Sequence, residues 1–432
     1  MTKKGEAMLK ALDVYLWGTR IGTAYSRDGH PIVQFEYSDE IRDLGVEVSP
    51  LKMPLSSERF EFPDLPIRSF KGLPGLLSDS LPDKFGNKVI AAWLREQGRN
   101  PDDLNALERL AYAGKRGMGA LEYVPSLLDK EDRAEAVDVA ELAILANDVL
   151  KDRTEARAEL KPGICHYAPI LRVGSSAGGA RAKALIGWNE QTGEVRSGQV
   201  KLPEDFGYWL IKFDGLDGNG DKEGDDKWGY GRVEYAYHLM AKAAGVEMTD
   251  CRLWNRRHFM TKRFDRLENG GKLHMLTLGG LAHMDFNNPI LYSYEEAFDI
   301  VRTLVNDASA NEQIFRRMVF NVLAWNCDDH VKNISFLMDR NGTWTLSPAY
   351  DECYAYNPNG DWTGRHQMSV NGKRLGITDE DMVACAARAN ISGRNARKFI
   401  SEVREAVRAW PRFAAEAEVK DEFVEKIQAR LI

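Results

Sequence analysis

The N-terminal part of the chain shows the alternation of apolar and polar residues that is typical of β-strands. Residues 14–17 and 20–22 lie on either side of Gly18-Thr19, an arrangement that predicts a β-hairpin. Residues 32–37 also alternate, as a strand with one buried face does. The stretch 72–83 is rich in turn-forming residues. We therefore expect a small β-rich module at the start of the chain.

Helical periodicity replaces this alternation over most of the remaining chain. Apolar positions spaced by a helical turn occur at 84–98, 103–113, 234–244, 294–306, 311–326 and through most of 378–432. Strand-like segments interrupt them at 184–188, 208–213 and 258–261. The charged, alanine-rich segment 128–160 predicts a helix and a linker. We expect an α+β protein with a β-rich module at 1–130, a helical linker at 131–164 and a larger module at 165–432.

Composition and charge narrow the class of protein. The 432 residues are 44% hydrophobic and 28% charged, which is ordinary for a soluble globular protein of roughly two or three domains. The five cysteines are widely spaced and form no CxxC pair, which indicates a reducing compartment and argues against a zinc site. No apolar run reaches the ~18 residues that span a bilayer, and the N-terminus lacks a signal-peptide pattern. We expect a cytoplasmic protein without membrane contact, and its net charge of -7 argues against nucleic-acid binding by the chain as a whole.

The stretch from Asn326 to Asn333, NCDDHVKN, carries the most informative chemistry. Asp328 and Asn333 have the spacing of a kinase catalytic loop, and they follow the helix predicted at 311–326. In such a loop the acid orients the attacking hydroxyl and accepts its proton, and the asparagine binds Mg²⁺. His330 lies between them and either touches the transferred phosphate or shapes the loop. An Asp–Asn pair alone is weak evidence, because both residues also cap helices and form turns.

The segment after this loop predicts that another acid joins it. Residues 334–338 have a strand pattern, 339–342 is the turn DRNG, and 343–346 is the returning strand. A hairpin brings the chain back to where it began, so we expect Asp351 to lie beside Asn333. Carboxylate and amide oxygens are hard ligands of the kind that Mg²⁺ prefers. The hairpin therefore favours a phosphoryl-transfer site over a purely structural role for these residues.

Two earlier segments have features of a nucleotide site. Residues 174–183, GSSAGGARAK, form a glycine-rich loop whose backbone N–H groups can approach phosphate oxygens. The loop is neither a Walker A motif nor the protein-kinase glycine pattern, and a flexible turn has the same composition. Lys212 lies in an apolar strand, where its ammonium needs an anionic partner such as a triphosphate or must extend to water. Glu234 is the first residue of the next predicted helix. Its carboxylate either holds Lys212 in place or only interacts favourably with the N-terminal end of the helix dipole.

Two further polar segments have less specific patterns. Residues 217–221, DGNGD, suggest a calcium loop, but Lys222 and Trp228 stand where an EF-hand needs glycine and glutamate. We therefore expect a mobile acidic loop there. The residues RFDR at 263–266 end a strand-like segment whose backbone is a candidate hinge for adenine, although a charged strand end is the ordinary interpretation.

Together these motifs resemble the HipA family of toxin kinases over nearly the whole chain. GGARAK, LIKF, RFDR, DDHVKN and SPAYD occur in the family's order and at similar spacing, and the set is specific although each member alone is not. The resemblance implies a two-lobed, protein-kinase-like α+β core with a small β-rich N-terminal module. It places the kinase domain at 165–432, with a nucleotide-binding lobe to about residue 265 and a mostly helical catalytic lobe over 266–432.

The resemblance also implies roles for single residues. Asp328 is the expected catalytic base, with His330 beside it, and Lys212 is the expected phosphate-binding lysine, supported by Glu234. Ser176 matches the position at which the family phosphorylates itself and switches off, with Ser175 as the second choice. Asn333 and Asp351 are the expected Mg²⁺ ligands. The expected ATP contacts are Gly178, Gly179, Ala180, Arg181, Ala182, Lys183, Lys212, Lys262, Arg263, Phe264, His330, Val331, Lys332, Asn333, Tyr350 and Asp351.

The activity implied by the resemblance is that of an ATP-dependent serine/threonine protein kinase of a type II toxin–antitoxin system, with ATP and Mg²⁺ as cofactors. The implied partners are a small helix-turn-helix antitoxin of the HipB kind, through which any DNA contact is made, and a translation-related substrate such as an aminoacyl-tRNA synthetase. A small-molecule or lipid kinase is one alternative, because the spacing of Asp328, His330 and Asn333 also resembles phosphoinositide kinases. A catalytically silent co-repressor is the other, and the intact Lys212 and Asp351 argue against it.

Overall fold

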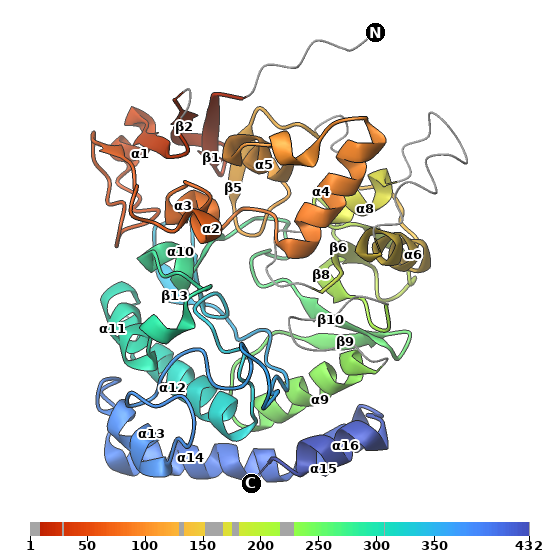
Figure 1. The fold of residues 1–432 in the computed structure, drawn as a ribbon, viewed down its shortest axis with the longest axis vertical. Coiled ribbons are helices and arrows are strands. Elements are labelled where there is room, and N and C mark those ends of the chain that lie inside the picture. The colour runs from red at the N-terminus through yellow and green to blue at the C-terminus, as the bar shows by residue number, and fades with distance from the viewer. Residues whose placement is uncertain are drawn as a thin grey trace. The chain divides into compact units, whose positions relative to one another are not determined.

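The computed structural model describes residues 9–27, 30–128, 134–151, 167–174, 181–216, 229–305 and 307–431. The chain forms two compact units, each built from segments that are distant in sequence (Figure 1). The N-terminal unit comprises residues 1–208, 265–285 and 339–342, and the C-terminal unit comprises 209–264, 286–338 and 343–432. The chain therefore leaves the N-terminal unit and returns to it twice.

An antiparallel sheet with the strand order β4-β3-β2-β1-β5 belongs to the N-terminal unit. Its strands are β1 (Ala11–Leu16), β2 (Thr19–Ser26), β3 (Val33–Tyr37), β4 (Arg59–Phe60) and β5 (Leu121–Val124). The hairpin predicted around Gly18 is confirmed, since Leu16 pairs with Thr19 and both Trp17 and Gly18 adopt positive φ. Alternate residues of β1, such as Val14, are buried, as the strand pattern predicted.

Most of the remaining elements of the N-terminal unit are helices. They are α1 (Asp39–Leu44), α2 (Ile67–Phe70), α3 (Gly75–Ser78), α4 (Lys84–Glu96), the 3-10 turn η1 (Pro101–Asp103), α5 (Ala106–Ala113), α6 (Val139–Leu150), α8 (Ala168–Val173) and α10 (Leu278–Ala282), with strands β6 (Lys183–Trp188), β7 (Val195–Ser197) and β11 (His274–Thr277). The helices predicted at 84–98, at 103–113 and within 128–160 are present, and several others, one of them inside the turn-rich stretch 72–83, were not predicted. Asp83 begins α4 by accepting the Gly86 N–H (2.6 Å). Asn105 and Glu108 form a capping box that starts α5 at Ala106, three residues later than predicted.

A close crossing of α3 and α10 joins residues 265–285 to the N-terminal unit. A Cβ on Gly75 would lie 2.0 Å from the Gly280 carbonyl oxygen, and one on Gly280 would lie 2.7 Å from the Asp79 carboxylate. That carboxylate accepts hydrogen bonds from the N–H (2.6 Å) and hydroxyl (2.8 Å) of Thr277. Only glycine permits such an approach of two backbones.

The C-terminal unit combines short strands with long helices (Figure 1). Its elements are β8 (Gly207–Lys212), whose first two residues belong to the N-terminal unit, α9 (Tyr230–Ala243), β9 (Cys251–Trp254), β10 (His258–Lys262), η2 (Pro289–Leu291), α11 (Tyr294–Leu304), α12 (Ala308–Leu323), β12 (Ser335–Met338), β13 (Trp344–Leu346), α13 (Asp379–Ala386), α14 (Gly393–Arg408), α15 (Trp410–Glu416) and α16 (Asp421–Gln428). β10 lies between β8 and β9, with Phe259 opposite Lys212. The helical tail predicted over 378–432 is confirmed.

The start of α9 differs from the prediction. The helix begins at Tyr230, directly after Gly229, so Glu234 lies in its second turn rather than at its start. Gly229 adopts φ 118° and donates its N–H to the Asp214 carboxylate (2.9 Å), which ends the preceding loop. Gly231 fits in the first turn because a Cβ there would meet the Arg257 carbonyl oxygen at 2.3 Å.

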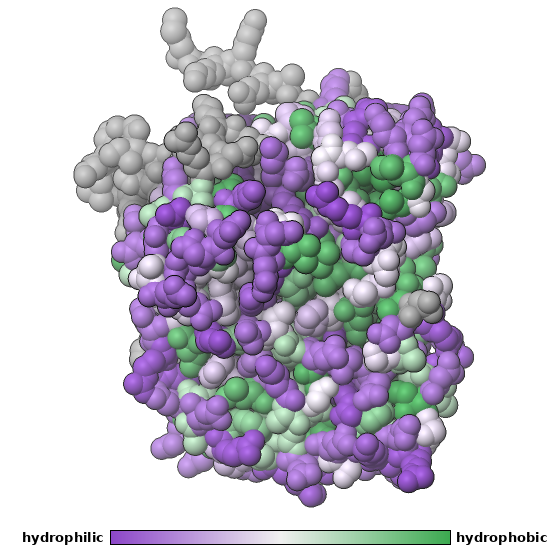
Figure 2. All heavy atoms as spheres, turned by 180° about the vertical axis from the view of Figure 1, so that it is seen from behind, coloured by the Kyte–Doolittle hydropathy of each residue, from purple (hydrophilic) through white to green (hydrophobic). Residues whose placement is uncertain are grey.

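Large aromatic side chains fill the contact between the long helices of the C-terminal unit. The ring of Tyr237 on α9 lies 6.1 Å from that of Phe320 on α12 and 5.4 Å from that of Trp410 on α15, between ring centroids. Within the part of the chain that the structure describes, no helix combines the length and apolar character needed to cross a bilayer. Hydrophilic side chains cover much of the face drawn in Figure 2, with apolar areas between them.

Candidate functional site

A hairpin brings two distant polar segments together in the C-terminal unit. β12 and β13 pair in antiparallel fashion with Phe336 opposite Leu346, as the turn at 339–342 predicted. After β13 the chain returns to the loop that follows α12, where the Tyr350 hydroxyl donates to the Lys332 carbonyl (2.6 Å). The predicted return of the chain to this loop is therefore confirmed for Tyr350, and the position of Asp351 beside Asn333 stays a prediction.

The loop from Asp328 to Asn333 is held by bonds to its own backbone. The Asp328 carbonyl accepts the His330 N–H (2.9 Å) and the Asn333 side-chain N–H (2.9 Å). The Asn333 N–H donates in turn to the His330 carbonyl (2.8 Å). Because the Asn333 amide uses its nitrogen in this way, its oxygen is the end that can bind a cation. The His330 Nε2 lies 4.0 Å from the Asp328 carboxylate, so these two side chains face the same space.

Lys212, Glu234 and Asp351 form a charged triad from three separate elements. Lys212 is the last residue of β8, and its ammonium contacts the Glu234 carboxylate on α9 and the Asp351 carboxylate after β13. Burial favours the neutral amine, but the carboxylates of Asp351 and Glu234 outweigh it and raise the pKa of Lys212 above its ordinary value. Lys212 is therefore an ammonium at neutral pH, and the triad draws residues from 139 positions apart into one site.

Asp351, an expected Mg²⁺ ligand, has an unusual backbone conformation and a partly exposed side chain. Its φ of 56° lies in the left-handed region, which aspartate tolerates better than most residues. Its side chain is 32% exposed, whereas that of Glu234 is 3% exposed. The carboxylate of Asp351 and the amide oxygen of Asn333 together offer the hard oxygen donors that suit Mg²⁺.

The expected adenine hinge lies at the end of β10. β10 ends at Lys262, and Arg263 after it is buried. The ring of Phe264 lies 5.6 Å from that of Tyr350, between ring centroids, so Phe264 is beside the segment that carries Asp351. Two further residues expected to contact ATP lie in the Asp328 loop: Val331 is buried, and the ammonium of Lys332 lies 4.8 Å from the centroid of the Phe286 ring.

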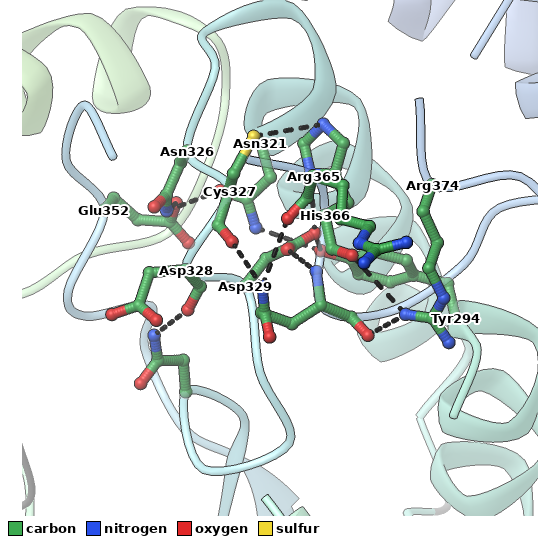
Figure 3. Close-up of polar contacts among 12 residues, drawn as sticks. Tyr294, Asn321, Asn326, Cys327, Asp328, Asp329, Glu352, Arg365, His366 and Arg374 are labelled. Atoms are coloured by element: carbon green, nitrogen blue, oxygen red, sulfur yellow. Dashed lines mark hydrogen bonds and ion pairs between the residues drawn. The ribbon is translucent and has the colours of Figure 1, made fainter. Parts of the chain in front are cut away.

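The neighbouring acid Asp329 has a different environment, which the sequence analysis did not identify (Figure 3). Its carboxylate is 2% exposed and accepts the Tyr294 hydroxyl (2.9 Å), the His366 Nδ1–H (3.0 Å) and the Gln367 N–H (2.8 Å). Burial lowers the pKa of His366, but the Asp329 carboxylate more than reverses this and raises it to about 10. Asp329 therefore forms a buried ion pair beneath the loop. The only sequence signal for it was the second acid of the DDH stretch, directly after Asp328.

A second buried acid, Glu352, follows Asp351 directly. It accepts a hydrogen bond from the Asn326 side chain (3.2 Å), which also donates to the Asn321 side-chain oxygen (2.9 Å). Burial raises the pKa of Glu352 to about 8, although Arg317 opposes this. These contacts connect the end of α12 with the segment that carries Asp351.

The expected phosphate loop is described only in part. Arg181 and Ala182 precede β6, and Lys183 is its first residue. The Lys183 ammonium is buried and lies 3.2 Å from the Asp83 carboxylate, both within the N-terminal unit. Burial raises the pKa of Asp83, and Lys183 offsets this only in part. Outside the described residues lie Gly178, Gly179, Ala180, Ser175, Ser176 and the acidic loop at 217–221.

The chain matches two family models, one over its N-terminal part and one over more than half of its length. Residues 12–124 match the HipA N-terminal domain, and residues 175–410 match the HipA-like C-terminal domain. Over 101 residues the chain is 31% identical to a Haemophilus influenzae protein named "Putative kinase". That match spans 22% of this chain and 29% of the relative, so it covers less than a third of the relative's length.

A solved structure establishes the fold over nearly the whole chain. It is HipA of Shewanella oneidensis MR-1, from a toxin–antitoxin complex of HipA, HipB and operator DNA. The similarity covers 97% of this chain and 95% of that one, with a TM-score of 0.64 and 17% sequence identity. The α+β fold with a β-rich N-terminal sheet and a helical C-terminal region is thus the HipA-like kinase fold.

Proposed function

Because the chain belongs to the HipA family, we propose that it is an ATP-dependent serine/threonine protein kinase of a toxin–antitoxin system. The observation that carries this proposal is the convergence of the Lys212 triad and the Asp328 loop in the C-terminal unit. A phosphoryl-transfer site needs a cation for the phosphates, oxygen ligands for Mg²⁺ and a carboxylate for the attacking hydroxyl. These three groups come from elements that a purely structural role would not need to bring together.

Each residue has a role that its environment supports. Asp328, partly exposed in its loop, orients the substrate hydroxyl and accepts its proton. Lys212 binds the phosphates, and the buried Glu234 keeps its ammonium in place. Asn333 and Asp351 would hold Mg²⁺, which would neutralise part of the charge of the triphosphate.

The triad also supports a change of partner for Lys212 when nucleotide binds. The ammonium is shared between Glu234 and Asp351. Asp351 is the more exposed of the two carboxylates, so it can turn to Mg²⁺ while Glu234 remains with Lys212. Lys212 would then hold the nucleotide phosphates with the part of its ammonium that Asp351 had contacted.

The finer features of the proposal concern partners and self-modification. We infer a HipB-like helix-turn-helix antitoxin as partner, because the S. oneidensis relative was solved with HipB and operator DNA. The proposed substrate is a translation-related protein such as an aminoacyl-tRNA synthetase. Ser176, or Ser175 in second place, is the proposed autophosphorylation site, since a phosphate there adds about -1.5 to -2 charge beside the expected triphosphate and would repel it.

The Asp328→Asn variant tests the proposal most directly. It should fold and bind ATP but transfer phosphate about 10²–10⁴-fold more slowly, because the carboxylate that accepts the proton is lost. Asp361→Asn makes the same chemical change at an exposed position and should leave the rate unchanged. Full autophosphorylation by Asp328→Asn would contradict the assignment of the catalytic loop.

The nature of the acceptor is tested with labelled ATP. Incubation with mixtures of protein, lipid and small-molecule acceptors should label protein only, and mass spectrometry should find the dominant site at Ser176 or Ser175. Label in lipid or a small molecule would favour the alternative kinase classes, and no ATP turnover at all would favour a silent co-repressor. A Ser176→Ala variant that remains active and becomes more toxic would support self-inactivation.

A further inference from the structure

Trp362, which lies outside every motif described above, contacts the proposed catalytic base. Its indole Nε1–H donates to one carboxylate oxygen of Asp328 (2.5 Å), across 34 positions of sequence. The indole also lies edge-on to the His330 ring, with 6.3 Å between ring centroids. An indole N–H can only donate, so this contact requires an acceptor oxygen on Asp328.

Hydrogen bonds from Gln367 connect the segment that carries Trp362 to the proposed catalytic loop. The Gln367 side-chain amide donates to the Trp362 carbonyl (2.5 Å) and to the Cys327 carbonyl (3.2 Å). Gln367 is 1% exposed, and its backbone N–H donates to the Asp329 carboxylate (2.8 Å). The position of Trp362 is therefore set from the loop residues on both sides of Asp328.

Asp329 provides the anchor for this arrangement (Figure 3). His366 forms an ion pair with Asp329 (3.0 Å), and its other ring nitrogen lies 3.9 Å from the Cys327 sulfur. Tyr294 from α11 donates to the same Asp329 oxygen. A carboxylate buried with this many donors holds its neighbours in one geometry, because breaking any of these bonds leaves a buried charge poorly satisfied.

We propose that Trp362 is a positioning residue that orients Asp328 for phosphoryl transfer, an inference that rests on the proposed kinase function. The terminal torsion of an aspartate has broad, shallow wells, so a carboxylate without a directional partner samples many orientations. The indole N–H holds one oxygen of Asp328 and thereby fixes the direction in which the carboxylate meets the substrate hydroxyl. Trp362 itself touches neither substrate nor nucleotide in this role.

The Trp362→Phe variant separates positioning from folding. Phenylalanine keeps an aromatic ring beside His330 and removes only the N–H donor. The kcat should fall about tenfold to a hundredfold, because the reacting oxygen is no longer held in place, while the KM for ATP stays within about twofold. Trp410→Phe is the matched control, since it removes an indole N–H that donates to the Val424 carbonyl (3.3 Å) among the C-terminal helices, and its kcat should be unchanged. A wild-type kcat for Trp362→Phe would overturn the inference.

A second measurement is independent of catalysis. In a ¹⁵N-tryptophan-labelled protein, the indole resonance that disappears in Trp362→Phe belongs to Trp362. It should shift in Asp328→Ala, which removes the acceptor, while the Trp410 resonance stays in place. An unmoved Trp362 resonance would overturn the inference whatever the enzyme's activity. Absence of phosphoryl transfer by the wild type would instead refute the proposed kinase function, and transfer with an unchanged Trp362→Phe rate would refute this inference alone.

Discussion

Lys183 in the N-terminal unit and Lys212 in the C-terminal unit were both expected to bind phosphate, yet their surroundings differ. Lys183 is the first residue of β6, and its buried ammonium lies 3.2 Å from the equally buried Asp83. Lys212 is the last residue of β8 and meets two carboxylates, one buried and one partly exposed. The side chain of Lys212 is 13% exposed and that of Lys183 is 4% exposed.

Because of this difference, Lys212 can exchange one partner for a ligand, whereas the same exchange at Lys183 has a high free-energy cost. Releasing Lys183 toward a ligand would leave the Asp83 carboxylate buried without its cation, which is costly. Releasing Lys212 from Asp351 leaves it with Glu234 and leaves Asp351 able to reach solvent or a metal ion. We infer that Lys212 serves the reaction and that Lys183 stabilises the N-terminal unit, and its expected phosphate contact stays a prediction.

The largest effect should come from Lys183→Met. Removing one partner of a buried ion pair costs about 3–5 kcal/mol of unfolding free energy, measured by urea denaturation. Adding Asp83→Asn should recover much of this loss, because asparagine removes the buried charge and still caps α4. Lys201→Met, at an exposed position of the same unit, is the control. A Lys183→Met protein of normal stability with a raised KM for ATP would contradict the structural role of Lys183 and favour the phosphate contact.

The next effect concerns Lys212→Met. Phosphoryl transfer should slow about 10²–10³-fold, or about 2.7–4 kcal/mol, because a preorganised cation for the phosphates is lost. Growth inhibition on overexpression should disappear with it. The variant is best combined with Glu234→Gln, so that no buried carboxylate is left unpaired and the fold is kept. Lys242→Met, at an exposed lysine of α9, should retain both activity and toxicity. Undiminished toxicity of the combined variant would mean that the harm does not arise from ATP chemistry.

A smaller effect is the pH dependence contributed by the buried carboxylate of Glu352, whose burial outweighs the influence of Arg317. Its pKa is raised from 4.5 to about 8, so between these values the folded chain keeps a proton that the unfolded chain has released. Stability should therefore fall as pH rises through this window, by roughly 2 kcal/mol between pH 6 and 8. Glu352→Gln should flatten that slope in denaturation curves taken at several pH values. Glu425→Gln, at an exposed position, should leave the slope as it is in the wild type.

The smallest effect should come from Tyr350→Phe, which tests how firmly the returning strand is held beside the catalytic loop. The lost hydroxyl donates to the Lys332 carbonyl (2.6 Å) and contacts the Ser335 hydroxyl (2.5 Å). We expect a loss of about 1 kcal/mol in unfolding free energy. A double-mutant cycle with Ser335→Ala should show that the two changes are not additive, and additive effects would mean that the hydroxyls are energetically independent.

Local patterns predicted the parts of the site that depend on one turn or one helix. The hairpin from β12 to β13 follows from four turn residues, and it alone places Tyr350 beside Lys332. The start of α9 was missed because Gly231, which favours a break in an isolated helix, is required by its close approach to Arg257. Propensity gave the wrong boundary where a tertiary contact decided it.

Pairings between residues that are far apart in sequence could not be predicted in this way. Asp329 meets His366 and Gln367 across 37 and 38 positions of sequence, through a segment that contains the hairpin of β12 and β13 followed by a long loop. Lys183 meets Asp83 across a whole set of helices and strands. No periodicity links such residues, so the support of the site became visible only in three dimensions. The tryptophan at position 362, in an otherwise polar loop, was the one local sign that this segment is not simply exposed.

The crossing of α3 and α10 has a consequence for how the protein is synthesised. Gly75 and Asp79 emerge from the ribosome about two hundred residues before Gly280 and Thr277, their partners in the N-terminal unit. That unit is therefore not completed until the strands β8, β9 and β10 have also been made. A nascent chain released after residue 124, where the N-terminal family match ends, would present the α3 surface without its cover. The N-terminal unit can therefore complete its folding only after the segment that carries Lys212 has been synthesised. Neither unit is finished long before the other.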